Sequence, residues 1–365
     1  MFSDSERLKN LDKILVIAVP AIGDFVYLVP FFKEISKRYP KLKIDLLLDE
    51  TGGRKIRRFN WKKKLSQKDS VIDWLSSLNF FNKIYRIYTS KKVLKDVLSQ
   101  ARKQNYQQIF VLSWGRPHRH VCYARKISPK GFVIATDCKK YPRFNKMVDL
   151  VLNYSSFLLK KTGEWHISEL FSSWFEQAFD LKLSKEQIKP FLSIPKKFQD
   201  DVKKSLVEWG VQNGEKTVFI NAYSSNKSRN WPIENVLGLI KKLQKKPLLS
   251  DSCFVINMPP GINKEDVVFA QKNLPSNTFA FSANQNFFQL PAMLSISDLV
   301  ISVDTSIIQL TPLLNTHLIA LMRGDSEWRP PKLETKNIIF TQNRGRIKTL
   351  SVENVACCVE KFFSL

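Results

Sequence analysis

Short runs of apolar residues alternate with longer amphipathic stretches along most of the 365-residue chain. A run of about 4–8 residues rich in Ile, Val, Leu and Phe is typical of a strand that is buried on both faces. The longer stretches, such as FFKEISKRY (31–39), repeat apolar residues at the spacing of a helix. Strands and helices that alternate in this way predict an α/β fold with parallel sheets.

The expected strands fall into two sets, one in each half of the chain. The first set is ILVIAV (14–19), KIDLLLD (43–49), QIFVLSW (108–114) and GFVIAT (131–136). The second set is TVFINAY (217–223), CFVINM (253–258), LVISVD (299–304), HLIALM (317–322) and NIIFTQ (337–342). The region 51–105, which contains GGRKIRRFNWKKK, is basic and aromatic and shows no clear period.

Between the two sets, KPFLSIPKKFQDD (189–201) combines two prolines and several charges with no clean period, which is typical of an interdomain connection. A chain of this length is also long for a single hydrophobic core. We therefore expect two Rossmann-like domains with mainly parallel sheets, at residues 1–190 and 191–365.

Positive charge is concentrated in the first half of the chain. The whole chain has 58 Lys and Arg against 33 Asp and Glu, and residues 1–190 hold 37 of the former and 18 of the latter. This excess favours an anionic partner such as a phosphorylated glycolipid, a membrane surface or a nucleic acid, and scattered solvated lysines are the simpler alternative. No helix-turn-helix, zinc-binding or RNA-recognition motif accompanies the charge, so we expect no nucleic-acid partner.

Cysteine spacing and the N-terminal segment bear on the location of the protein. The five cysteines form no Cys-x-x-Cys pair and no metal-ligand spacing, so we expect reduced thiols in a cytoplasmic protein. The segment MFSDSERLKNLDK is charged, unlike a signal peptide, and no apolar run approaches the ~18 residues that would span a bilayer. Any contact with a membrane is therefore expected to be peripheral.

Asp24 follows the first expected strand, after the turn PAIG, at the cap or first turn of the next helix. Open α/β sheets bind ligands at this edge. An acidic residue here is often a helix cap, which accepts N–H groups and offsets the helix dipole. The functional alternative is a carboxylate that takes a proton from an acceptor hydroxyl.

Two further polar segments follow buried strands in the second half. NAYSSNKSRNWP (221–232) offers Ser224 and Ser225 as hydrogen-bond donors and Arg229 as a cation for a diphosphate. DTS (304–306) precedes an apolar helical stretch, where backbone N–H groups favour an anion. A polar loop and an ordinary capping sequence are the structural alternatives, and Trp231 is expected in the core.

These stretches together resemble the ADP-heptose:lipopolysaccharide heptosyltransferase family, glycosyltransferase family 9, which has the two-domain GT-B fold. AIGD followed by Pro30 is similar to the family's strand, Leu-Gly-Asp and proline signature. SSNKSRNWPIENVLGLI looks like its Ser/Lys-x-Trp-Pro helix start, and LPAMLSISDLVISVDTSIIQLTPLL resembles its long C-terminal block. The likeness covers residues 12–50 and 215–325 well and 51–190 loosely.

The resemblance implies a role for each matching residue in an inverting, metal-independent transfer that needs no cofactor. Asp24 is implied as the general base and Arg229 as the group that stabilises the leaving diphosphate. The implied donor-binding residues are Ser224, Ser225, Arg229, Asn263, Asp304, Thr305 and Ser306. Chain and family differ at Ser306 and Gln309, where the family usually has Gly and His, so a changed donor or acceptor and a non-catalytic relative stay open as alternatives.

The resemblance also divides the work between the two domains. The N-terminal domain is implied to hold the acceptor, a lipopolysaccharide or lipooligosaccharide inner core at the cytoplasmic face of the inner membrane, and the C-terminal domain the nucleotide sugar, most simply ADP-heptose. The basic residues available to the acceptor are Arg54, Arg57, Arg58 and Lys62. We further expect the last helix, about 350–365, to pack back on the N-terminal domain.

Overall fold

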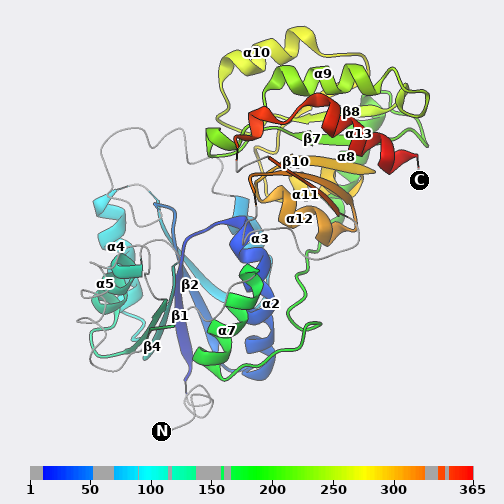
Figure 1. The fold of residues 1–365 in the computed structure, drawn as a ribbon. Helices are drawn as coiled ribbons and strands as arrows, with labels where there is room; N and C mark the ends of the chain where they lie inside the picture. Colours follow the sequence, from blue (N-terminus) through cyan, green and yellow to red (C-terminus); the bar gives the residue numbers. More distant parts are fainter. Residues whose placement is uncertain are drawn as a thin grey trace. The chain divides into compact units, whose positions relative to one another are not determined.

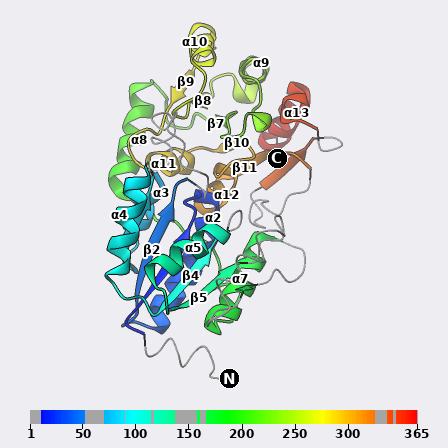
Figure 2. The same cartoon turned by 90° about the vertical axis from the view of Figure 1, so that its left-hand side faces the viewer.

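The computed structural model describes residues 11–51, 70–88, 90–113, 117–136, 158–159, 166–324, 336–341 and 345–364. The chain divides into two compact units, Met1–Pro190 and Phe191–Leu365. Each unit is an α/β layer structure around one parallel sheet (Figures 1 and 2). We call them the N-terminal unit and the C-terminal unit and describe each by itself.

The N-terminal unit contains a sheet in the order β3-β2-β1-β4-β5-β6, and every strand pairs in parallel with its neighbours. Its elements are β1 (Lys13–Ala18), α2 (Ile22–Arg38), β2 (Lys43–Asp49), α3 (Ser70–Ser76), β3 (Phe81–Ile87), α4 (Lys91–Arg102), β4 (Gln108–Leu112), α5 (Pro117–Ile127), β5 (Phe132–Thr136), β6 (Leu158–Leu159) and α7 (Ile167–Phe179).

Helices cover both faces of this sheet because successive strand residues point to opposite sides. Val111 of β4 packs in a cluster with residues of α4 and α5. Its neighbour Phe110 stacks on Phe179 of α7, with ring centroids 4.1 Å apart. On that second face, Phe31 of α2 stacks on Phe175 of α7 at 4.5 Å. Burial on both sides explains why these strands are continuous apolar runs in the sequence.

The C-terminal unit contains a second parallel sheet, in the order β12-β11-β10-β7-β8-β9. Its elements are α8 (Lys196–Glu208), β7 (Thr217–Asn221), η1 (Lys227–Arg229), α9 (Ile233–Leu243), η2 (Pro247–Leu249), β8 (Cys253–Asn257), α10 (Lys264–Asn273), β9 (Thr278–Phe281), α11 (Gln289–Ser295), β10 (Leu299–Val303), α12 (Ile307–Leu310), η3 (Thr311–Leu314), β11 (His317–Met322), β12 (Lys336–Phe340), η5 (Ile347–Thr349) and α13 (Val352–Phe363).

In the C-terminal unit, α9 and α13 pack together over one face of the sheet, and α8 contacts α11 (Figure 1). Trp231 is 1% exposed, as its expected place in the core requires, and its indole N–H donates to the Leu350 carbonyl at 3.0 Å. This bond ties the loop before α9 to the segment before α13. Within this unit the last helix, α13, packs on α9, and Val355 and Val359 lie in the same buried cluster; its expected contact with the N-terminal domain stays a prediction.

The α/β fold with two parallel sheets confirms the fold class predicted from the sequence, and the differences are local. The region 51–105, in which no period was found, contains α3, β3 and α4 in its described part. β3 is missed because it is an edge strand whose burial alternates only in its second half, and β9 because it has four residues. The segment 189–201, expected as a connection, already contains the start of α8 at Lys196.

Truncation of Phe31 tests the packing of α2 on α7. Phe31 is fully buried and stacked, so Phe31→Ala is expected to lower the free energy of unfolding by about 3–5 kcal/mol. Val207→Ala is the control, because Val207 is 74% exposed on α8, and it should change stability by less than about 0.5 kcal/mol. Urea unfolding followed by circular dichroism measures both; equal midpoints for the two variants would contradict the packing described.

Candidate active site

Both sheets have a switch point, a central strand on whose two sides the following strands are added in turn. In the N-terminal unit β1 lies between β2 and β4, and in the C-terminal unit β7 lies between β8 and β10. Loops that follow the carboxyl ends of such strands separate from one another and leave a crevice for ligands. Most of the candidate residues predicted from the sequence follow β1, β7 and β10, and Asn263 follows β8.

Asp24 lies in the first turn of α2, three residues after the turn that leaves β1. The N-cap of α2 is Ala21, no side-chain hydrogen bond caps the helix, and within the described residues no group donates to the Asp24 carboxylate. Asp24 is partly accessible, yet desolvation by the surrounding protein raises the pKa of its carboxyl group from 3.8 to about 7. Asp24 therefore does not cap α2 through a side-chain hydrogen bond, and its carboxyl group is poised to exchange a proton near neutral pH.

At the end of the neighbouring strand β2, an aspartate has its hydrogen-bond partners within the protein. Asp49, at the end of β2, accepts a hydrogen bond from the Thr51 hydroxyl at 2.6 Å and lies 2.8 Å from His120 Nε2 of α5. Asp49 and His120 are both fully buried. The pair joins the end of β2 to α5, the helix that follows β4 in the chain.

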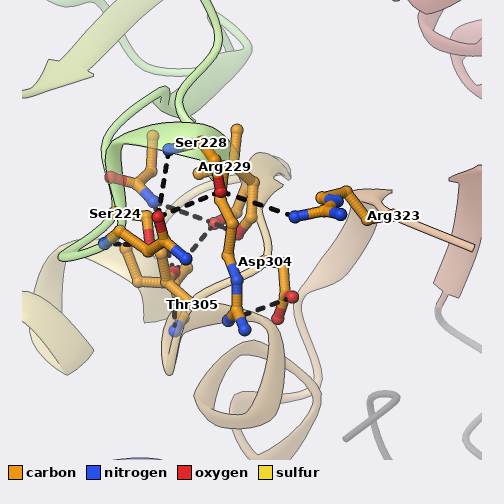
Figure 3. Close-up of polar contacts among 11 residues, drawn as sticks. Ser224, Ser228, Arg229, Asp304, Thr305 and Arg323 are labelled. Atoms are coloured by element: carbon orange, nitrogen blue, oxygen red, sulfur yellow. Dashed lines mark hydrogen bonds and ion pairs between the residues drawn. The ribbon is translucent and has the colours of Figure 1, made fainter. Parts of the chain in front are cut away.

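The loop after β7 is held in shape by its own side chains (Figure 3). The Ser224 N–H donates to Asn230 Oδ1 at 2.8 Å, and the Asn226 N–H donates to Ser224 Oγ at 3.3 Å. Asn226 Oδ1 in turn accepts from the N–H and the hydroxyl of Ser228. These bonds form the single turn η1, which ends at Arg229 and fixes where that side chain starts.

Arg229 and Asp304, predicted separately from two segments, meet in the structure. Arg229 Nη1 lies 3.1 Å from Asp304 Oδ2, and their side chains are 42% and 11% exposed (Figure 3). Desolvation raises the pKa of Asp304, and the guanidinium groups of Arg229 and Arg323 oppose that shift. The pair joins the loop after β7 to the end of β10, the two strands of the switch point.

A buried polar network adjoins this ion pair through Thr305, which follows Asp304 directly. Asn221, the last residue of β7, donates through Nδ2 to Ser302 Oγ at 3.0 Å and to Thr305 Oγ1 at 3.3 Å. Asn257, the last residue of β8, donates to Asn221 Oδ1 at 2.9 Å. The network therefore joins the ends of β7, β8 and β10 and orients Thr305, whose hydroxyl accepts the Ile307 N–H at 3.3 Å. Satisfied buried polar groups of this kind give a rigid floor to the site.

The other predicted residues are placed differently. Ser225 is exposed on the loop, and Ser306 is the partly buried N-cap of α12. Asn263 is the N-cap of α10, and both ends of its amide bond to Glu265, so within the described part of the chain it makes no polar contact with the Arg229–Asp304 pair. The expected acceptor residues Arg54, Arg57, Arg58 and Lys62 lie outside the described residues.

Arg323 is the site residue that sequence reasoning missed. It follows β11 directly, and its Nη1 donates to Ser228 Oγ at 3.4 Å (Figure 3). The sequence did contain an indication of this residue, because HLIALM was expected as a buried strand and the residue that follows it is basic. The asparagines that end TVFIN and CFVIN were also missed, because an amide at the end of a buried strand does not by itself indicate a binding site.

The described residues contain no group of three or more His, Cys, Asp or Glu side chains arranged to hold a metal ion. None of the helices in the described ranges has both the length and the hydrophobicity of a membrane span.

Comparison with known proteins gives this arrangement a family. The model of glycosyltransferase family 9 (heptosyltransferase) matches residues 143–359, more than half of the chain. The chain belongs to glycosyltransferase family 9. It is therefore a glycosyltransferase with the GT-B fold, as the resemblance of its motifs implied. A search of curated proteins by sequence finds no match.

Solved structures of a family 9 glycosyltransferase and of heptosyltransferases share the fold at low sequence identity. A glycosyltransferase family 9 structure from Veillonella parvula superposes with a TM-score of 0.72 at 13% identity, over 97% of each chain. ADP-heptose lipopolysaccharide heptosyltransferase II of E. coli gives 0.67 at 13%, over 96% of this chain and 98% of that one. The E. coli heptosyltransferase WaaC with ADP-2-deoxy-2-fluoro heptose gives 0.65 at 14%, over 96% and 99%.

The raised pKa of Asp24 predicts a pH-dependent effect of Asp24→Asn on stability. The unfolded carboxyl ionises near 3.8 and the folded one near 7, so the parent protein loses stability as pH rises between these values, whereas the amide does not titrate. The melting temperature of Asp24→Asn relative to the parent should rise from about pH 4 to about pH 7 and then stay constant. Thermal melts across this range measure it.

Asp12→Asn is the matched control, since Asp12 is an exposed carboxylate just before β1. Its melting temperature relative to the parent should show no comparable rise. A pH-independent difference for Asp24→Asn would mean that the Asp24 carboxyl titrates like a solvated one.

Proposed function

We propose that this family 9 enzyme is an inverting glycosyltransferase that moves heptose from ADP-heptose to a lipopolysaccharide or lipooligosaccharide inner-core acceptor. The observation that carries the proposal is the meeting of Arg229, Asp304, Thr305 and the Ser224 loop at the switch point of the C-terminal unit. A cation, hydroxyl groups and backbone N–H groups at the carboxyl edge of a parallel sheet suit a nucleoside diphosphate.

The donor is proposed from the family and from the similar structures. WaaC of E. coli, which shares the fold, is described with ADP and with a fluorinated ADP-heptose. In the proposal, Arg229 and the Ser224 and Ser225 hydroxyls bind the diphosphate, and Asp304, Thr305 and Ser306 bind the sugar and its phosphate. Asn263 would bind the ribose only after its amide breaks its hydrogen bond to Glu265 and forms one to the ligand.

The proposed reaction is a single displacement at the anomeric carbon of the donor sugar. Asp24 takes the proton of an acceptor hydroxyl while that oxygen bonds to the anomeric carbon, and the bond from this carbon to the diphosphate oxygen breaks. The leaving nucleoside diphosphate carries the developing negative charge, which Arg229 and the loop donors stabilise. A guanidinium in this position does the work that a divalent cation does in other transferases, so activity is expected to withstand chelation.

The acceptor and the location are proposed from charge. The excess of positive charge in residues 1–190, including Arg54, Arg57, Arg58 and Lys62, favours the phosphates and carboxylates of an inner core. The same charge favours peripheral contact with an anionic membrane surface at the cytoplasmic face of the inner membrane.

Substitution of Asp24 tests the chemical step. Asp24→Asn preserves shape and removes the base, so kcat for heptose transfer should fall at least ~100-fold while the Kd of the donor changes little. In the parent enzyme, kcat should rise with pH to a plateau through an inflection near pH 7, because only the ionised carboxylate accepts the proton. Steady-state kinetics with ADP-heptose measure both; an unchanged kcat in the variant would remove Asp24 from catalysis.

Substitution of Arg229 tests the donor site. Arg229→Ala should weaken ADP binding about 10- to 100-fold, and Arg229→Lys should weaken it less because charge remains without the two-pronged geometry. Calorimetric titration gives the affinities, and UDP and GDP serve as competitors for donor identity. Equal affinity for ADP in parent and Arg229→Ala would place the diphosphate elsewhere, and a preference for UDP or GDP would replace the proposed donor.

A further inference from the structure

Strand register brings Arg323 to the donor site. β10 and β11 pair in parallel with Val303 opposite Leu321. Asp304, which follows β10, therefore lies beside Met322, the last residue of β11, and Arg323 is the next residue. Gly324 follows with φ of 56°, a left-handed conformation that glycine adopts without strain and that turns the chain after Arg323. Strand pairing and this turn fix where the Arg323 side chain begins.

The contacts of Arg323 direct it toward the loop that holds Arg229. Its Nη1 donates to Ser228 Oγ at 3.4 Å, and Ser228 immediately precedes Arg229 (Figure 3). Ser228 is itself fixed by Asn226 Oδ1, which accepts its hydroxyl at 2.9 Å. Within the described part of the chain, Ser228 is the hydrogen-bond partner of the exposed Arg323 side chain, and the other N–H groups of this guanidinium make no hydrogen bond to the described residues.

Two arginines act on one aspartate at these strand ends. Asp304 is influenced by both guanidinium groups, from Arg229 at 3.1 Å and from Arg323. Among the charged groups that the structure describes here, one carboxylate therefore lies near two permanent cations. A structural ion pair needs only one arginine, whereas two guanidinium groups beside hydroxyl and backbone donors match the charge of a diphosphate.

We propose that Arg323 is a second phosphate-binding residue of the donor site, which acts with Arg229 on the diphosphate of the nucleotide sugar. The inference rests on the proposed function and adds to it a residue outside the motifs through which the chain resembles its family. Ser228 holds Arg323 in place before the donor arrives. Asp304 neutralises part of the charge until the phosphates replace it as a partner of Arg229.

The test is calorimetric titration of the full-length protein with inorganic pyrophosphate and with ADP. Arg323→Ala should weaken both ligands about tenfold, and Arg323→Glu should weaken them about 100-fold or more because it reverses the charge. Lys241→Ala is the control for loss of one positive charge, since Lys241 is exposed on α9, and it should change either affinity less than about twofold. Arg323 is exposed, so melting temperatures of all variants should match the parent.

The outcomes separate this inference from the proposed function. If the parent binds neither ligand, the donor site itself is wrong and the inference falls with it. If the parent binds both and Arg229→Ala is weakened while Arg323→Ala and Arg323→Glu are not, the donor site stands and the assignment of Arg323 is overturned. A loss of ADP affinity with unchanged pyrophosphate affinity also overturns it, because Arg323 would then contact the nucleoside.

Discussion

Parallel pairing is the constraint from which the rest of this structure follows. Every strand of both sheets runs in the same direction as its neighbours, so all carboxyl ends of a sheet lie at one edge. In each sheet the first strand is central, and the chain crosses to one side of it and then to the other. Residues far apart in sequence, such as Arg229 and Asp304, meet because they follow adjacent strands of the same sheet.

The carboxyl edges of the two sheets differ in how their aspartates, Asp304 and Asp24, are neutralised. In the C-terminal unit, among the described residues, the carboxylate of Asp304 is compensated by two arginines, and the nearby buried amides of Asn221 and Asn257 have hydrogen-bond partners. In the N-terminal unit Asp24 is desolvated without a compensating cation among the described residues. At pH values above the ordinary pKa of an aspartate, this desolvation lowers the stability of the folded protein. A cost of this kind is typical of groups that transfer protons.

The sequence predicts the fold well where burial is continuous. Strands such as β2 and β11 have the predicted bounds because both of their faces are covered and their apolar runs begin and end sharply. β3 and β9 lie at sheet edges, where one-sided burial leaves too few apolar positions to recognise. The packing of α13 on α9 was also unpredictable, because an amphipathic helix shows that it has a buried face and not which partner covers it.

The sequence motifs identified the loops of the site, but they did not show which loops contact one another. Asp24, Arg229 and Asp304 were each found from a polar residue after a buried run, but the contact between the last two depends on strand order. Arg323 escaped because a single basic residue after a strand is common, and its relevance appears only when β11 is seen beside β10.

A crystal structure of the protein with ADP tests the central claim most directly, namely that the strand ends of the C-terminal unit bind the diphosphate of the donor. The account predicts phosphate oxygens within hydrogen-bond distance of the Arg229 guanidinium, between the Ser224 loop and the start of α12. Phosphates bound at any other place, with the Arg229–Asp304 ion pair undisturbed, would contradict it.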